Sequence, residues 1–120
     1  MNSAYTFLKK CGVFFLITDN NGVPAGRPFD TLIQDENDLI IGVGNSKDIY
    51  RQLKRNSRIQ IVALDYETKE WIRINAFAYE EYDDHNRNRL IESSDFLKSN
   101  PKSVDELSIF KIEVLDYRVY

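Results

Sequence analysis

Residues 39–63, LIIGVGNSKDIYRQLKRNSRIQIVA, place one amphipathic segment between two apolar runs. Ile49 and Leu53 share a face at i and i+4, so the middle segment is expected to form a helix at about 46–55. The run LIIGVG before it, and the run SRIQIVALDY that follows, have the composition and alternation of β-strands. The stretch therefore predicts a strand, a helix and a strand in succession.

Lys47 is unusual because it falls at the positive end of this predicted helix. Asn45 or Ser46 is the expected N-cap, which puts Lys47 in the first turn, where the helix dipole disfavours a cation. Either the neighbouring Asp48 offsets the charge, or an anion sits at the helix N-terminus. Arg27, inside the run AGRPF, is a second such cation, since an arginine within a strand must reach solvent or meet an anion. A phosphate would suit both cations, because a guanidinium grips its oxygens in a fork and an ammonium adds a mobile charge.

The rest of the chain predicts more strands than helices. DNNG, with Asn-Gly at its centre, marks a hairpin between the runs at 12–18 and 23–34, and two prolines put the second run at a sheet edge or bulge. Alternating apolar and polar residues predict long two-faced strands at 70–82 and 107–120. The remaining segments are expected to be a short helix at 3–10, one helix or two short helices at 85–98, and a loop at 93–103.

Together these elements predict a mainly β fold, a six-stranded antiparallel β-barrel with a few helices. A chain of 120 residues, 42 % of them hydrophobic, fits one domain spanning 1–120. The formal net charge of −3 argues against a general nucleic-acid-binding protein. No segment approaches the roughly 18 apolar residues that a membrane helix needs, and the N-terminus has no signal-peptide core, so we expect a cytoplasmic protein without membrane association.

Cysteine and histidine are too few for several kinds of chemistry. The single cysteine, Cys11, excludes an internal disulfide, and with the single histidine, His85, it leaves no metal site of the usual Cys/His kind, so no metal is expected. Cys11 borders an apolar run, which favours a buried, inert thiol. The cations Arg51, Lys54 and Arg55 are expected to form a solvated helix face. No residue stands out as a general acid or base.

The order of these pieces resembles the pyridoxamine 5′-phosphate oxidase-like flavin proteins, specifically the short bacterial branch that includes general stress proteins. The resemblance rests on GRPF, DLIIGVG, NSKDIYRQLKRNSRIQIVA and EWIRINAFA, and it covers about residues 5–120. It implies a split-barrel homodimer that binds FMN in two equivalent clefts at the subunit interface. On that basis we expect an FMN-dependent oxidoreductase whose substrate is unknown.

The resemblance also assigns residues to an FMN phosphate site. It implies that Arg27 and Lys47 contact the phosphate, that Ser46 adds a hydroxyl or amide, and that Asn45 lines the loop. A phosphate carrying a charge of about −1.5 to −2 would outweigh the unfavourable helix dipole at Lys47.

Further residues are implied for the isoalloxazine ring. The residues expected to run beside it are Pro28, Phe29, Asp30 and Thr31. Trp71 and Arg73 would approach from the partner chain, although Trp71 also fits the alternative of a large core or interface aromatic. Strand alternation puts Arg73 on the same face as Trp71, so both should lie at the flavin or both should lie elsewhere.

Departures from the family pattern narrow the expected activity. Vitamin B6 oxidases of the family carry further C-terminal sequence with a substrate-binding arginine and histidine, which this chain lacks, so pyridoxamine phosphate oxidase activity is not expected. Gly42 and Gly44 stand where many relatives have a hydroxyl residue, and Asn75-Ala76 stands where many have a glycine. Two other functions stay open: a non-catalytic flavin-binding or stress-related interaction protein, and an oligonucleotide-binding barrel, which the acidic composition disfavours.

Overall fold

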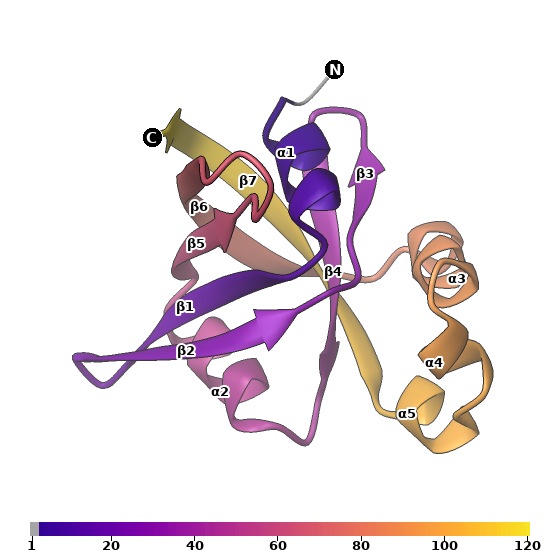
Figure 1. Ribbon diagram of the computed structural model, residues 1–120. Helices are drawn as coiled ribbons and strands as arrows, with labels where there is room; N and C mark the ends of the chain where they lie inside the picture. The colour runs from indigo at the N-terminus through magenta and orange to yellow at the C-terminus, as the bar shows by residue number, and fades with distance from the viewer. Residues whose placement is uncertain (1–2) are drawn as a thin grey trace.

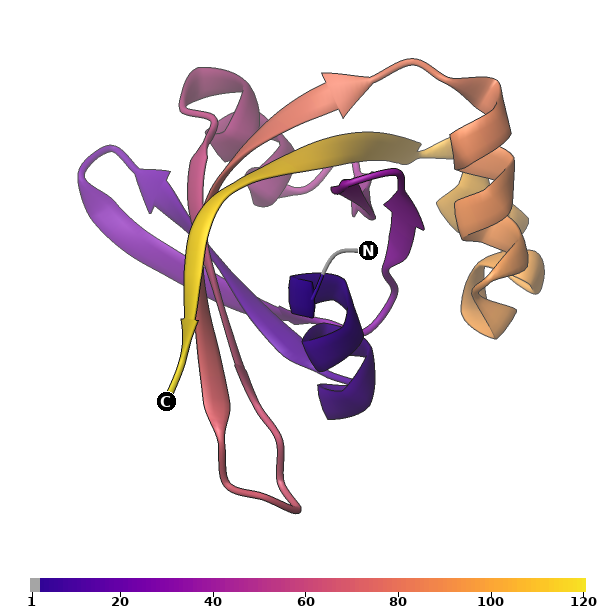
Figure 2. The same ribbon diagram turned by 90° about the horizontal axis from the view of Figure 1, so that it is seen from above.

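An antiparallel sheet of seven strands, in the order β2-β1-β5-β6-β7-β4-β3, organises the protein (Figure 1). The computed structural model describes residues 3–120. Figure 2 shows that the sheet curls around α1, while α3, α4 and α5 lie together at one side. The elements are α1 (Ser3–Cys11), β1 (Phe14–Asn20), β2 (Val23–Phe29), β3 (Ile33–Asp35), β4 (Asp38–Gly44), α2 (Asp48–Arg55), β5 (Arg58–Leu64), β6 (Trp71–Glu81), α3 (Asp84–Glu92), α4 (Asp95–Lys98), α5 (Pro101–Asp105) and β7 (Leu107–Val119).

The β1–β2 hairpin has the predicted Asn-Gly turn. Asn20 pairs with Val23, and the two residues between them, Asn21 and Gly22, have φ angles of 52° and 87°. Two successive positive φ values are the mark of a type I′ turn, whose twist matches that of the flanking strands. The hairpin places β2 at one edge of the sheet, which confirms the prediction made from its prolines.

The prediction of six strands is wrong, because the sheet has seven, whereas a split-barrel-like fold is consistent with the structure. The single strand expected at 23–34 is divided into β2 and β3 by residues 30–32, which belong to no strand. β2 pairs with β1, whereas β3 pairs with β4, so the two parts lie at opposite edges of the sheet. The sheet is therefore open between these edges, and the fold is split-barrel-like.

Alternation along β5 and β6 builds the main core as predicted. β5 buries Ile59, Ile61 and Ala63, and β6 buries every second residue over 72–78. Leu8 of α1 packs into the same cluster and is itself buried. The other faces of these strands are half-exposed or exposed, which leaves side chains there for other contacts.

A β-bulge lets β7 bend around this core. Ala76 pairs with Val114, but Asn75 pairs with Asp116, so Leu115 is an extra residue in the ladder. Such a residue bends and twists its strand. β7 can therefore pair with β4 through its first residues and with β6 along most of its length.

The segment between β6 and β7 is more helical than predicted. α3 and α4 confirm the alternative of two short helices, but the loop expected at 93–103 contains α4 and α5 instead. The Ser94 hydroxyl accepts the backbone N–H of Leu97 at 3.2 Å, and Pro101 occupies the start of α5. Both are helix N-terminal signals within an apparently irregular stretch. Within residues 3–120, no helix has the length and apolar character that a membrane crossing needs.

A second apolar cluster fixes these helices to the sheet. Its buried members are Ile33, Ile40, Leu90, Leu107 and Ile109. They come from β3, β4, α3 and β7, so the helical segment is attached to the outer face of the same strands that contribute to the main core. The helices α3, α4 and α5, which we call the helical wall, thus lie beside the open edge of the sheet (Figure 2).

Candidate functional site

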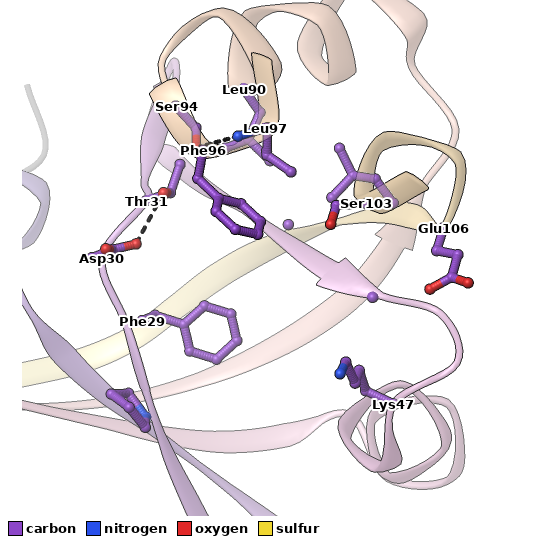
Figure 3. Close-up of a pocket in the computed structure, with 14 residues that line it drawn as sticks. Phe29, Asp30, Thr31, Lys47, Leu90, Ser94, Phe96, Leu97, Ser103 and Glu106 are labelled. Atoms are coloured by element: carbon purple, nitrogen blue, oxygen red, sulfur yellow. Dashed lines mark hydrogen bonds between the residues drawn. The ribbon is translucent and has the colours of Figure 1, made fainter. Parts of the chain in front are cut away.

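A cavity of about 480 Å³ lies between the end of β2, the β4–α2 turn and the helical wall (Figure 3). It is bordered by side chains from segments that are far apart in sequence. Its lining residues are Pro28, Phe29, Asp30, Thr31, Gly42, Gly44, Lys47, Leu90, Ser94, Phe96, Leu97, Ser103, Glu106 and Leu107. The structure therefore brings together the predicted ring-side residues at 28–31 and the predicted phosphate ligand Lys47.

Beside this cavity, other side chains lie very close to the backbone of two glycines of β4. A Cβ added at Gly42 would lie 2.7 Å from Cδ2 of Leu90 and 2.8 Å from Cδ1 of Leu107, and one added at Gly44 would lie 3.1 Å from Cγ of Lys47. The first contacts are too short for a real side chain unless the side chains of Leu90 and Leu107 move. The glycines that depart from the family pattern therefore have a packing reason in this chain.

Lys47 is the N-cap of α2, so the prediction of Asn45 or Ser46 as the cap is wrong. Its backbone is extended, with φ −86° and ψ 159°, and no side chain caps the helix. Figure 3 shows its side chain directed into the cavity, and the ammonium has no hydrogen-bond or ion-pair partner among residues 3–120. Asp48 pairs with Arg51 rather than with Lys47, so the exposed Lys47 ammonium is available to solvent or to an anion.

Arg27 is a half-buried cation surrounded by neutral oxygens. Its Nη1 donates to the backbone oxygen of Leu16 at 3.2 Å and to Oγ1 of Thr18 at 2.9 Å, and its Nη2 donates to Oε1 of Gln52 at 2.8 Å. Thr18 and Gln52 are both buried. Burial lowers the pKa of Arg27 below its ordinary value, and the charge of Asp48 acts in the opposite direction.

One edge of this guanidinium remains available. The three bonds leave Nε–H and one Nη2–H without acceptors among the described residues. Oε1 of Gln52 lies 2.5 Å from Oγ1 of Thr18, so these two acceptors occupy the Nη1–Nη2 edge and the free donors share the other edge. Two parallel donors of this kind match the oxygens of a phosphate or carboxylate. Arg27 does not itself line the cavity.

Asn45 and Ser46 use their side chains elsewhere. Nδ2 of Asn45 donates to Oγ of Ser108 at 3.4 Å, and the Ser46 hydroxyl donates to Oε2 of Glu106 at 3.2 Å. The backbone N–H of Asn45 donates to the backbone oxygen of Glu106 at 2.7 Å. These bonds fix the turn before Lys47 to the start of β7, and neither residue lines the cavity.

Trp71 and Arg73 lie together, as alternation predicted, but away from this cavity. The Trp71 ring stacks on Tyr120 at a centroid distance of 4.2 Å, and the Arg73 guanidinium lies 5.1 Å from the Trp71 ring. Trp71 also borders an apolar groove with Val13 and Phe15. Within one chain, Trp71 and Arg73 therefore belong to a separate surface.

The cations Arg51, Lys54 and Arg55 of α2 all have partners within the chain, and Cys11 is a half-buried free thiol. Lys54 pairs with the buried Glu80 at 2.9 Å, and Arg51 pairs with Asp48. Nη2 of Arg55 donates to Oδ1 of Asn20 at 3.5 Å. Burial raises the pKa of the half-buried Cys11 thiol, in keeping with an inert residue.

Several residues of the site were missed at the sequence level, among them Thr18 and Gln52, which hold Arg27, and Phe96, which lines the cavity. Gln52 carried a usable signal, because it is a polar residue on the buried face that α2 forms with Ile49 and Leu53. Thr18, at the end of an apolar strand, and Phe96, in a charged segment, had no comparable signal.

Comparison with solved structures identifies the fold. A NimC/NimA family protein from Clostridium acetobutylicum is 25 % identical, with a TM-score of 0.81 over 98 % of this chain and 88 % of that one. A candidate pyridoxamine 5′-phosphate oxidase from Listeria innocua is 18 % identical, with a TM-score of 0.81 over 97 % and 94 %. General Stress Protein 26 from Bacillus anthracis is 14 % identical, with a TM-score of 0.79 over 96 % and 88 %.

No family model and no curated protein matches the chain. The structural neighbours are proteins of the group that the sequence resembles, which confirms the resemblance. The chain thus has the fold of the pyridoxamine 5′-phosphate oxidase-like and general stress protein 26 structures.

Proposed function

We propose that the protein is a flavoprotein that holds FMN in the cavity beside Lys47 and works as an oxidoreductase. The observation that carries this proposal is the pair of cations without counter-ions: Lys47 faces the cavity, and Arg27 keeps a free bidentate edge although it is half-buried. A half-buried cation without a carboxylate partner is best explained by an anionic ligand, and the exposed Lys47 adds a second positive charge that faces the cavity. The resemblance to flavin proteins supports FMN as that ligand.

The charges of these residues suit the phosphate of FMN. Lys47 would supply a mobile charge and Arg27 a fixed fork for the phosphate, since Thr18 and Gln52 hold its other edge. The backbone at 28–31 would run along the ring, and Phe29 has a fixed orientation because it stacks on Phe14 with a centroid distance of 5.8 Å. FMN, when bound, supplies hydride and electron transfer, while the protein positions reactants and excludes water.

We also propose that two copies assemble so that each completes the other's site. An apolar groove bordered by Val13, Phe15, Leu64 and Trp71 lies on the outer surface, and the Phe15 side chain is 50 % exposed. A two-fold contact would bury this groove and could bring Trp71, with Arg73, toward the partner's cavity. In such a dimer Trp71 would serve the partner's cavity, which would explain why it lies away from the cavity of its own chain.

The FMN site is tested by visible spectroscopy and by a titration. The purified protein, or the protein after addition of FMN, should have the absorbance bands of bound oxidised flavin. Lys47→Ala and Arg27→Ala should each weaken FMN binding by about 1.5–3 kcal/mol, as expected for charged hydrogen bonds, without unfolding the protein. Arg51→Ala is the matched control, because Arg51 lies on the same helix and pairs with Asp48. Equal affinity in all four proteins would contradict the proposal.

A second experiment separates an oxidoreductase from a non-catalytic flavin carrier. An oxidoreductase should be reduced by a nicotinamide cofactor in stopped-flow absorbance and reoxidised by an acceptor such as a quinone, a nitro compound or oxygen. A carrier would show no turnover with any donor and acceptor pair, and FMN would only raise its thermal stability by mass action. Bound flavin without turnover across such a panel would therefore favour the carrier.

A further inference from the structure

Phe96 occupies an unusual position for a large apolar side chain. It belongs to α4, its side chain is 64 % exposed, and it takes no part in the apolar cluster that fixes the helical wall. Figure 3 shows its ring directed into the cavity, on the side opposite Phe29. Two aromatic rings from distant segments therefore face the same space.

The ring of Phe29 is held by stacking, and the backbone that carries Phe96 is held by hydrogen bonds. Phe29 stacks on the buried Phe14 with an interplanar angle of 15°. Nδ2 of Asn100 donates to the backbone oxygen of Phe96 at 2.6 Å, and the Ser94 hydroxyl caps the helix on which Phe96 lies. The exposed Phe96 ring is thus presented by a backbone that is tied at both ends of the short helix.

The surface around Phe96 is suited to an apolar ligand with few polar atoms. Leu90 and Leu97 of the helical wall and Leu107 of β7 line the same cavity as Phe96. Ser103 adds a hydroxyl to the lining, whereas the Thr31 hydroxyl donates to Oδ1 of Asp30 at 3.2 Å. A hydroxyl can donate a hydrogen bond to an oxygen of a ligand. Charged groups are confined to Asp30, Lys47 and Glu106.

We propose that Phe96 forms a binding site for a planar aromatic substrate of the quinone class, which the cavity holds against the helical wall. This proposal rests on the proposed function, because the cavity would hold FMN along 28–31 and the substrate on the Phe96 side. Ring stacking explains why an aromatic side chain is kept exposed here. The hydroxyl of Ser103 would donate to a carbonyl oxygen of the substrate.

The probe for this proposal is 2,3-dimethyl-1,4-naphthoquinone, whose substituted ring positions prevent addition of the Cys11 thiol. Its binding to the oxidised, FMN-loaded protein is measured by perturbation of the flavin absorbance, and its binding to FMN-free protein by calorimetry. Cyclohexane-1,4-dione has the same two carbonyl groups on a puckered ring and should bind at least about tenfold more weakly.

Phe96→Ala should weaken quinone binding about tenfold and leave FMN affinity within about twofold, whereas Phe96→Tyr should retain both. Tyr66→Ala is the control, because Tyr66 is 77 % exposed in the β5–β6 turn and should affect neither ligand. Unchanged quinone affinity in Phe96→Ala would overturn the proposal. An equal loss of FMN affinity would also overturn it, since Phe96 would then cover the cofactor. Failure of the wild type to bind FMN would overturn the proposed function, and the calorimetric comparison would still test Phe96.

Discussion

At the scale of single residues, the site depends on a cation that is hydrogen-bonded but not neutralised. Gln52 is the residue that makes this possible, because a neutral amide oxygen orients Arg27 at 2.8 Å without competing for its charge. A carboxylate in the same place would pair with Arg27 and would also repel a bound phosphate. In the proposed FMN site, we therefore expect the identity of this one side chain on α2 to set the affinity for the phosphate.

We accordingly predict that Gln52→Glu weakens FMN binding by about tenfold or more and leaves the fold intact. The affinity is measured by quenching of flavin fluorescence, and the fold by circular dichroism. Gln34→Glu on β3 is the matched control, because Gln34 does not line the cavity and its backbone oxygen accepts from Arg89. Undiminished FMN affinity in Gln52→Glu would show that Arg27 does not serve the phosphate.

At the scale of elements, α1 is joined to the β5–β6 turn by one buried carboxylate. Asp65 is buried, and its Oδ2 lies 2.9 Å from Nζ of Lys10 in an ion pair. Its backbone also orders the turn, since its N–H donates to the oxygen of Glu70 and its oxygen accepts from Lys69, both at 2.8 Å. The hydrogen bond from Lys10 holds the pKa of Asp65 below its ordinary value.

This shift predicts how the ion pair responds to pH. Because the folded-state pKa of Asp65 is lower than the unfolded-state value of about 3.9, its contribution to stability is complete above that value and is lost as the pH falls through the folded-state pKa. Asp65→Asn should therefore lower the free energy of unfolding by a constant amount above about pH 5, and the difference should shrink below about pH 4. Urea denaturation at several pH values measures both limits.

Asp95→Asn provides the control for that measurement. The Asp95 carboxylate is exposed on α4 and lies 3.4 Å from Nζ of Lys98, an arrangement typical of weak surface pairs. Its replacement should change stability by less than about 0.5 kcal/mol at any pH. A difference between Asp65→Asn and wild type that stays the same down to pH 2 would contradict the assigned role of Asp65.

At the scale of the whole molecule, the proposed dimer brings the apolar groove of one chain next to the FMN cavity of the other. Within one chain the groove and the cavity are separate. We expect light scattering at micromolar concentration to give about twice the chain mass of 14.1 kDa. Phe15→Glu, which puts a charge into the apolar groove, should yield monomers and lose FMN affinity, although Phe15 does not line the cavity. Tyr82→Glu is the control, because Tyr82 is 81 % exposed outside that groove. A monomeric wild-type protein loaded with flavin would contradict the dimer model.

The sequence by itself determined the features that depend on neighbouring residues. The Asn21-Gly22 turn was predictable because both residues accept positive φ, and β5 and β6 were predictable because burial of one face imposes a two-residue period. The association of Trp71 with Arg73 followed from the same period. These signals lie within a few residues of the structure that they specify.

Only the tertiary structure decided the features that depend on distant partners. The run at 23–34 became two strands because its ends pair with different neighbours, β1 and β4. Arg27 and Gln52 are 25 positions apart, so no local pattern could reveal that the amide orients the guanidinium. Phe96 likewise faces Phe29 only because Leu90 and Leu107 fix the helical wall beside the sheet. Packing between remote segments, which no short window of sequence contains, places these side chains.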